Sequence, residues 1–233
     1  MIKKLLLTLA PVLVLASFAV MPAFAQAQTR AYGICEKGTP HTAECPAGEK
    51  NFKAFTNKVA VKVITKKTKE GPPFVLTDTV TGGVIECKSL NDKGTVENVG
   101  GIGKSKEELT FDECSVLVGT TRCKVITAGN SPNVVGTVTD IVEPGGTTVT
   151  ITVTGGFALI FDGLPASPPC PAAGTPIGTV TGSATGAQAA GSNDLVFKAA
   201  PGLFLGKDAS TITGNDESFF ENAKKELVPV VIN

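Results

Sequence analysis

The residues of this chain whose types suit chemistry are one histidine, six cysteines and a dense group of lysines. His41 lies between Cys35 and Cys45, so a zinc site would have to be built from these three side chains. Zinc prefers about four ligands in tetrahedral geometry, whereas two cysteines in an oxidising compartment readily form a disulfide. A Ser-His-Asp or Cys-His mechanism would also depend on His41, and no nucleophile motif lies near it. We therefore expect no catalytic residue, no metal ligand and no cofactor site.

Lysines crowd residues 50–69, where valines alternate with polar residues in the manner of a β-strand. Lys58, Lys62 and Lys66 are four residues apart and would lie on one face of that strand. Such a face could bind an anionic cell-envelope polymer or lipid head groups. The alternative is that the lysines protect an edge strand from pairing with other sheets. The sequence favours edge protection and leaves anion binding as the best functional lead.

Two further patterns resemble ligand sites but fail on spacing. Residues 100–105 (Gly-Gly-Ile-Gly-Lys-Ser) resemble a phosphate-binding loop, yet Asn98 stands where that motif requires glycine, so we interpret the stretch as a turn. Pairs of acidic residues could bind calcium, but no loop shows the regular spacing of a calcium site. These pairs are Glu107/Glu108, Asp112/Glu113 and Asp216/Glu217.

The first 25 residues predict export. Lys3 and Lys4 precede an apolar run over residues 5–20, and Ala23-Phe24-Ala25 is typical of a signal-peptide cleavage site. An uncleaved membrane anchor is the alternative, because residues 5–24 are about long enough to cross a bilayer. The prolines and the alanine pair favour cleavage. We expect a secreted, extracellular protein that begins near Gln26 and has no membrane span after cleavage.

The amino-acid composition argues against two classes of function, nucleic-acid binding and sugar recognition. The whole chain carries 21 basic and 21 acidic residues, so it lacks the basic excess of a nucleic-acid-binding protein. It contains no tryptophan and one tyrosine, which counts against recognition of sugars by aromatic rings. Its 26 glycines and 15 prolines favour strands and turns over helices.

The six cysteines predict three disulfides, since they form an even set in an exported chain. Cys35 and Cys45 are close in sequence, and so are Cys114 and Cys123, which flank a short hairpin. We expect each of these pairs to form a local bridge, which leaves Cys87 to pair with Cys170. Other pairings of six cysteines stay open.

Period-two alternation and turn residues predict an all-β fold, either a mainly antiparallel β-sandwich or an irregular barrel. The clearest strand is 148–154, with Val149, Ile151 and Val153 on its core face, and 157–161 is expected to be its hairpin partner. A short helix is expected over residues 218–227 and a final strand over 228–232. The other expected strands are 58–64, 74–80, 84–88, 95–99, 109–114, 122–127, 134–141, 177–181 and 195–199. Residues 26–57 are expected to form a disulfide-tied N-terminal segment and residues 58–233 the β-domain.

Several short motifs are shared with a wider group of proteins. They are Gly-Gly-x-Ile-x-Cys at 82–87, a strand ending in cysteine at 109–114, the later Cys123 and Cys170, Leu-x-Phe-Lys at 195–198 and Phe-Glu-x-Ala at 220–223. In these motifs the chain resembles a group of uncharacterised, exported, β-rich proteins of soil actinobacteria, over about two thirds of its length. The resemblance implies export and a β-rich fold. It implies no mechanism, because no activity is established for the group.

The sequence favours a secreted, non-enzymatic β-domain protein that acts as a surface-associated structural domain or as a binding module. One alternative is a secreted hydrolase with a carboxylate or Ser-Lys site, for which we would expect a cleft lined by Asp and Glu. The other is a barrel that carries a small ligand, for which we would expect an apolar cavity in the interior.

Overall fold

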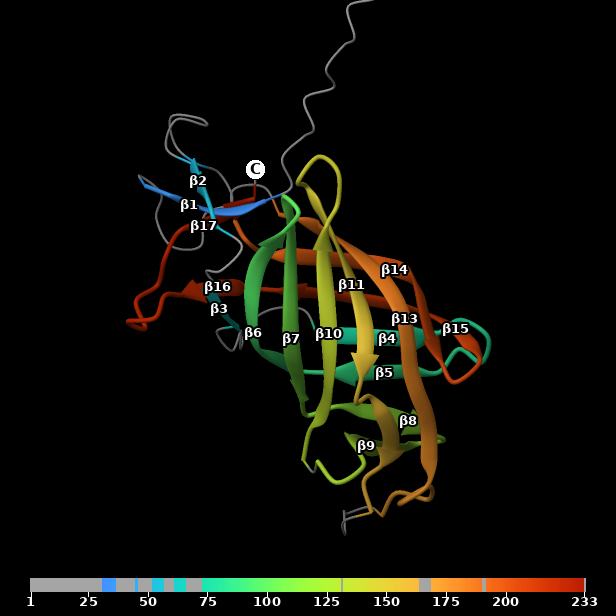
Figure 1. Ribbon diagram of the computed structural model, residues 1–233. Helices are drawn as coiled ribbons and strands as arrows, with labels where there is room; N and C mark the ends of the chain where they lie inside the picture. The colour runs from blue at the N-terminus through green and yellow to red at the C-terminus, as the bar shows by residue number, and fades with distance from the viewer. Residues whose placement is uncertain are drawn as a thin grey trace, which may run out of the picture.

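The computed structural model describes residues 31–36, 45, 52–56, 61–65, 73–130, 132–163, 169–189 and 192–232. Within these ranges the protein is all-β, with antiparallel strands, and has no helix (Figure 1). The expected fold class is therefore confirmed, in its barrel form. The signal peptide at residues 1–25, most of the N-terminal segment at 26–57, Lys58 and Lys66 lie outside the described residues.

The strands are short at the ends of the chain and long in the middle. They are β1 (Tyr32–Cys35), β2 (Phe52–Ala54), β3 (Val61–Thr65), β4 (Phe74–Asp78), β5 (Val84–Cys87), β6 (Ser89–Val99), β7 (Ile102–Asp112), β8 (Ser115–Val118), β9 (Thr121–Thr127), β10 (Val134–Val142), β11 (Thr148–Gly155), β12 (Ala158–Phe161), β13 (Pro176–Gln188), β14 (Leu195–Leu205), β15 (Asp208–Asp216), β16 (Ser218–Glu221) and β17 (Val230–Ile232).

Eight of these strands form a closed ring in the order β12-β9-β8-β5-β4-β15-β14-β13, which closes through the pairing of β12 with β13. From β13 the same sheet continues outward through β11, β10, β7, β6, β3 and β16. Figure 1 shows β6, β7, β10, β11 and β13 as one layer, with β4, β5, β14 and β15 running across behind it. The core lies between these two crossed layers, to which buried residues of both contribute.

Glycines allow β13 and β14 to bend from one layer to the other. Gly182 and Gly202 both have positive φ, of 95° and 104°, and they flank a shift in the β13–β14 register. A Cβ at Gly182 would lie 2.2 Å from the carbonyl oxygen of Gly202, so the two backbones approach too closely for any side chain. Such bulges with glycine are the usual way in which a sheet turns a barrel corner.

The side chains of β11 face the core and the opposite side in the order that the alternation predicts. Val149 is buried, and Ile151 and Val153 pack against the core. On the other face the hydroxyls pair across strands, with Thr150 and Thr152 each 2.9 Å from a hydroxyl of β13. The pairing partner was predicted wrongly, because β10 and β13 occupy the two edges of β11, and β12 pairs with β9 and β13 instead.

The prediction of a helix over residues 218–227 is also wrong. Phe219 and Phe220 belong to β16, where Phe220 pairs with Val63 of β3. The chain then turns, and the side-chain oxygen of Asn222 accepts hydrogen bonds from the backbone N–H groups of Lys224 and Glu226. These contacts hold a tight turn, as Asn side chains commonly do, in place of a helical one.

The three disulfides are Cys35–Cys45, Cys87–Cys114 and Cys123–Cys170. The local bridge Cys35–Cys45 is confirmed, whereas the predicted pairs Cys114–Cys123 and Cys87–Cys170 are wrong.

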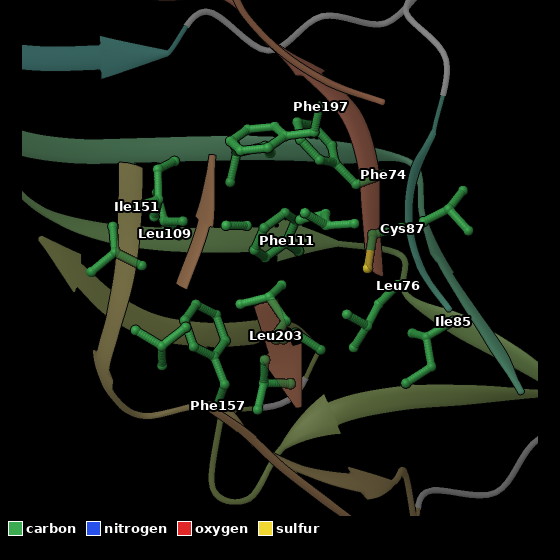
Figure 2. Close-up of a pocket in the computed structure, with 18 of the residues that line it drawn as sticks. Phe74, Leu76, Ile85, Cys87, Leu109, Phe111, Ile151, Phe157, Phe197 and Leu203 are labelled. Carbon is green, nitrogen blue, oxygen red and sulfur yellow. The ribbon is translucent and has the colours of Figure 1, made fainter. Parts of the chain in front are cut away.

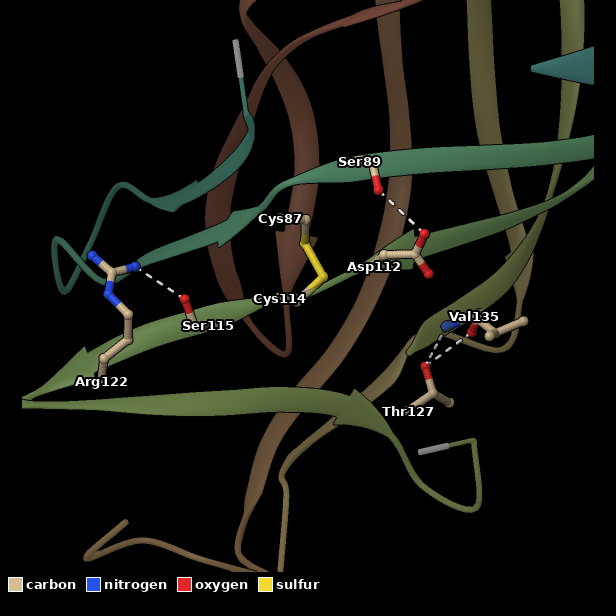
Figure 3. Close-up of a disulfide and its surroundings, with 8 residues drawn as sticks. All are labelled: Cys87, Ser89, Asp112, Cys114, Ser115, Arg122, Thr127 and Val135. Carbon is tan, nitrogen blue, oxygen red and sulfur yellow. Dashed lines mark hydrogen bonds between the residues drawn. A yellow bond between two sulfur atoms is a disulfide. The ribbon is translucent and has the colours of Figure 1, made fainter. Parts of the chain in front are cut away.

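Strand pairing explains the exchange of partners. The β8–β9 hairpin exists as expected, but its register places Cys123 opposite Val116 and not opposite Cys114. Cys114 instead meets Cys87, because β5 and β8 are neighbours in the ring (Figure 3). The nearby Thr127 hydroxyl exchanges two hydrogen bonds with the backbone of Val135, which ties β9 to β10.

A small second sheet, in the order β17-β1-β2, lies beside one end of the barrel (Figure 1). Asn98, at the end of β6, holds it through three hydrogen bonds. Its side chain accepts from the Tyr32 N–H at 2.8 Å and donates to the carbonyls of Tyr32 and Phe55 at 2.8 and 3.0 Å. Asn193 adds a bond to the carbonyl of Val230. The end of the barrel is therefore covered by segments from both termini of the described chain.

Candidate functional site

The interior of the barrel contains an apolar cavity of about 100 Å³ (Figure 2). Four phenylalanines contribute to its wall, namely Phe74, Phe111 and Phe197 from three strands and Phe157 from the connection between β11 and β12. The Phe74 and Phe111 ring centroids are 5.3 Å apart with a nearly perpendicular geometry, and those of Phe111 and Phe157 are 6.2 Å apart. The first pair is edge-on and the second is tilted, and both avoid the unfavourable face-to-face stacking of aromatic rings.

Two of these rings rest directly on backbone. A Cβ placed on Gly136 would lie 2.3 Å from the Phe157 ring, and one on Gly214 would lie 2.3 Å from the Phe74 ring. Each ring therefore fills the space that a side chain on the neighbouring strand would take. The cavity is the room that remains between the layers after this close packing.

The wall is apolar except at one point. Of the described residues that line the cavity, Asp216 is the one with a charged or polar side chain. A cavity lined in this way binds water poorly, because a buried water needs two to four polar partners. The cavity is suited to hydrocarbon rather than to solvent.

A second, smaller cavity of about 40 Å³ lies beneath the small sheet. Its wall includes the carboxyl groups of Glu107, Asp140 and Asp216, and Tyr32 of β1 lies against it. All four residues are buried, with exposed fractions of 5–7%. Asp92, which is also buried, adds a fourth carboxyl close enough to act on Glu107.

Burial and mutual repulsion make the carboxyl groups of Glu107 and Asp140 hard to ionise. Burial is the main cause that raises the pKa of Glu107 well above its usual value, and the negative charge of Asp92 raises it further. The pKa of Asp140 is raised well above normal by burial and then by the charge of Glu107, while the Ser105 hydroxyl acts in the opposite direction. Burial, followed by the charge of Asp140, raises the pKa of the Tyr32 phenol.

Two observations limit what this acidic cavity can hold. The Oδ1 atom of Asp140 has no hydrogen-bond partner in the described part of the chain, and no ion pair there joins Glu107 or Asp140 to a basic side chain. Yet no group of three His, Cys, Asp or Glu side chains among the described residues is arranged to hold a metal ion. The site therefore offers acceptor oxygens without metal-ligand geometry.

The structure describes only some of the site residues that the sequence predicted. Lys62 lies in β3, but its side chain, like all of Lys58, Lys66 and His41, lies outside what the structure describes. Anion binding by the lysine face therefore stays a prediction. Residues 100 and 101 form the turn between β6 and β7, whereas residues 102–105 belong to β7, so the interpretation as a turn is confirmed only for the first two residues.

Sequence reasoning missed the acidic cavity, although the signal was present. Glu107 is in phase with the buried Leu109, and Asp140 is in phase with the buried Val138 and Val142. The acidic pairs had been considered for calcium, but Glu108 is exposed on the opposite face of β7 from Glu107. A carboxyl group at a position that the alternation assigns to the core is therefore the signal that would have predicted this cavity.

No protein-family model, curated protein or solved structure matches this chain. Within the described residues, no helix has the length and apolar character needed to cross a membrane. The site must therefore be interpreted from its own geometry.

Proposed function

We propose that this protein is an exported, non-enzymatic binding module that carries a small apolar molecule inside its barrel. The apolar interior cavity is the observation that supports this proposal. Small ligand sites are typically concave, mainly apolar and lined by aromatic side chains with few polar groups. This description fits the cavity between the two strand layers.

The size of the cavity indicates the size of the ligand. A cavity of about 150 Å³ lined by Leu, Ile and Phe stays dry and binds benzene or xenon. The present cavity, at about 100 Å³, is of the same order and has the same kind of wall. We therefore expect a ligand whose apolar part is about as large as one aromatic ring or a short alkyl chain.

The three disulfides support export, because such bonds persist in oxidising compartments outside the cytoplasm. Cleavage of residues 1–25 and extracellular release are part of the proposal. They agree with the resemblance to exported proteins of soil actinobacteria.

The hydrolase alternative is less well supported. The carboxyl groups that could act as a catalytic pair surround a cavity of about 40 Å³, which is less than half the volume of the apolar cavity. A sugar ring does not fit in that space. The acidic cavity is therefore a poor site for glycoside hydrolysis.

Titration with ethylbenzene tests the proposal, with methyl NMR spectra of the oxidised protein as the readout. We expect saturable shifts at the methyl groups that line the cavity, such as those of Leu109 and Leu203. Ala184→Leu fills the cavity and should abolish the shifts. Ala187→Leu, on the exposed face of the same strand, is the matched control and should leave them unchanged. Absence of shifts at saturating ethylbenzene in the unmodified protein would overturn the proposal.

A further inference from the structure

The apolar and acidic cavities are neighbours along the same strands. On four strands, two residues that are two positions apart line different cavities, one the apolar cavity and the other the acidic cavity. With the residue of the apolar cavity given first, these pairs are Leu109 and Glu107 on β7, Val138 and Asp140 on β10, Ile151 and Val149 on β11, and Phe197 and Leu195 on β14. Two residues of a strand span about 6–7 Å, so the two walls are separated by the length of a few bonds.

Asp216 marks the boundary between the two cavities. It is the residue that lines both of them, and it is the polar residue in the wall of the apolar cavity. A molecule in the apolar cavity that extends towards Asp216 would therefore reach the acidic cavity. There it would meet the Oδ1 atom of Asp140, which has no hydrogen-bond partner among the described residues although the side chain is only 5% exposed.

We propose that the natural ligand is a small amphiphilic amine, with its apolar body in the apolar cavity and its protonated amino group among Glu107, Asp140 and Asp216. This inference rests on the proposed function and adds the chemical class of the ligand.

An ammonium group fits the acidic cavity by size, hydrogen bonding and charge. A cavity needs about 10–15 Å³ to hold one water-sized group, so the volume of about 40 Å³ leaves room for an ammonium group. An ammonium group has up to three N–H donors and no acceptor, which matches a wall of carboxyl oxygens. Hydrogen bonds between an ammonium and a carboxylate are about twice as strong as neutral ones. A metal ion is a poorer fit, because the described residues lack the required arrangement.

The amine should release protons from the protein when it binds. Three carboxyl groups line the cavity, from Glu107 on β7, Asp140 on β10 and Asp216 on β15, and Tyr32 of β1 lines it as well. Asp92 on β6 adds a fourth carboxyl close to Glu107. Burial and mutual repulsion favour the protonated forms of Glu107 and Asp140 in the free protein, whereas a nearby cation favours the ionised forms. The affinity for an amine should therefore rise with pH while the amine stays protonated.

Three ligands of nearly equal shape test the inference: 2-phenylethylamine, 2-phenylethanol and ethylbenzene. Isothermal titration calorimetry in buffers of different ionisation enthalpy gives both the affinity and the number of protons released. We expect the amine to bind at least about tenfold more tightly than ethylbenzene, as a charge-assisted hydrogen bond allows. Binding of the amine, but not of ethylbenzene, should release protons.

Two substitutions remove the carboxyl groups without changing their shape. Glu107→Gln and Asp140→Asn should each reduce the affinity for the amine about tenfold, and the affinity for ethylbenzene should stay within about twofold. Glu108→Gln is the matched control, because it makes the same change on the same strand but on the exposed face. The comparison of ligands on the unmodified protein needs no variant, so it remains decisive if a substitution prevents folding.

The outcomes separate the two proposals. If ethylbenzene binds and the amine binds no more tightly, the amine inference is overturned and the proposed function stands. Preference for 2-phenylethanol over the amine would also overturn it, in favour of a neutral polar group. If none of the three binds, the proposed function itself fails.

Discussion

Filling the apolar cavity should make the protein more stable. Ala184 lies on β13 opposite Ile151, its side chain is 3% exposed, and it is part of the cavity wall. Ala184→Leu adds three carbon atoms that point into empty space. At about 0.8 kcal/mol for each buried methylene, the free energy of unfolding should rise by about 2.4 kcal/mol. For a protein of this size the melting temperature should rise by about 5–10 °C.

The competing effect has the opposite sign. If the layers were packed without a void at Ala184, the larger side chain would force its neighbours apart and cost about 1–3 kcal/mol. Urea unfolding monitored by circular dichroism measures the difference, provided that the slope with denaturant is unchanged. Ala187→Leu controls for hydrophobicity on the same strand and should change stability by no more than about 0.5 kcal/mol. A loss of stability in Ala184→Leu would refute the presence of a usable cavity.

Three further perturbations test other parts of the structure. Because the folded state raises the pKa of Glu107 above its unfolded value, the folded protein binds more protons between the two pKa values. The free energy of unfolding should therefore fall as the pH rises through that window, and Glu107→Gln should flatten the profile in urea titrations. Asn98→Ala removes three hydrogen bonds to the backbone beside the small sheet and should cost about 2–4 kcal/mol. Hydrogen exchange should then be faster at the Tyr32 amide, and equal protection there would contradict the role assigned to Asn98. Replacing Cys123 and Cys170 together by alanine opens a loop with a sequence separation of 47 residues, which should lower the free energy of unfolding by about 4 kcal/mol. An unchanged urea midpoint in that double variant would argue against this disulfide.

Local alternation predicted the existence of many strands. Residues 148–154 were expected and Thr148–Gly155 is observed, and residues 122–127 were expected where Thr121–Thr127 is observed. In residues 148–154 apolar side chains alternate strictly with polar ones, and 122–127 follow the same pattern up to Val125. The long strands β6 and β7 were predicted only at one end, because acidic and hydroxyl side chains such as Asp92, Ser105 and Glu107 occupy inward positions where the pattern requires apolar ones.

The features that depend on distant partners were not predictable. The Cys87–Cys114 bridge follows from the pairing of β5 with β8, which no local pattern records. The continuous strand β13 was expected to stop near residue 181, since Gly182 and Gly186 are typical of loops. In the structure these glycines instead give room to Gly202 and to the Leu195 side chain on β14.

The cavities depend both on local alternation and on contacts between distant strands. Most of the lining residues occupy apolar positions of strands, which a sequence can indicate, but the void is defined only when two layers cross. The acidic character of one end of the barrel, in contrast, can be predicted from the sequence, because a carboxyl group at an inward position interrupts the alternation of apolar and polar residues. Glu107, Asp140 and Asp92 are three such exceptions, on three consecutive neighbours of the sheet.

The clustering of these exceptions supports a role in binding over a role in stability. Isolated carboxyl groups inside a protein are costly, and apolar residues of similar volume at these positions would give a more stable barrel. The cost is concentrated at one end of the barrel, next to the apolar cavity and under the small sheet. Natural sequences depart from the pattern that folding favours mainly where function requires it. A barrel that kept only an apolar cavity would need none of these acids, so their position argues that the ligand itself presents a positive group to this end.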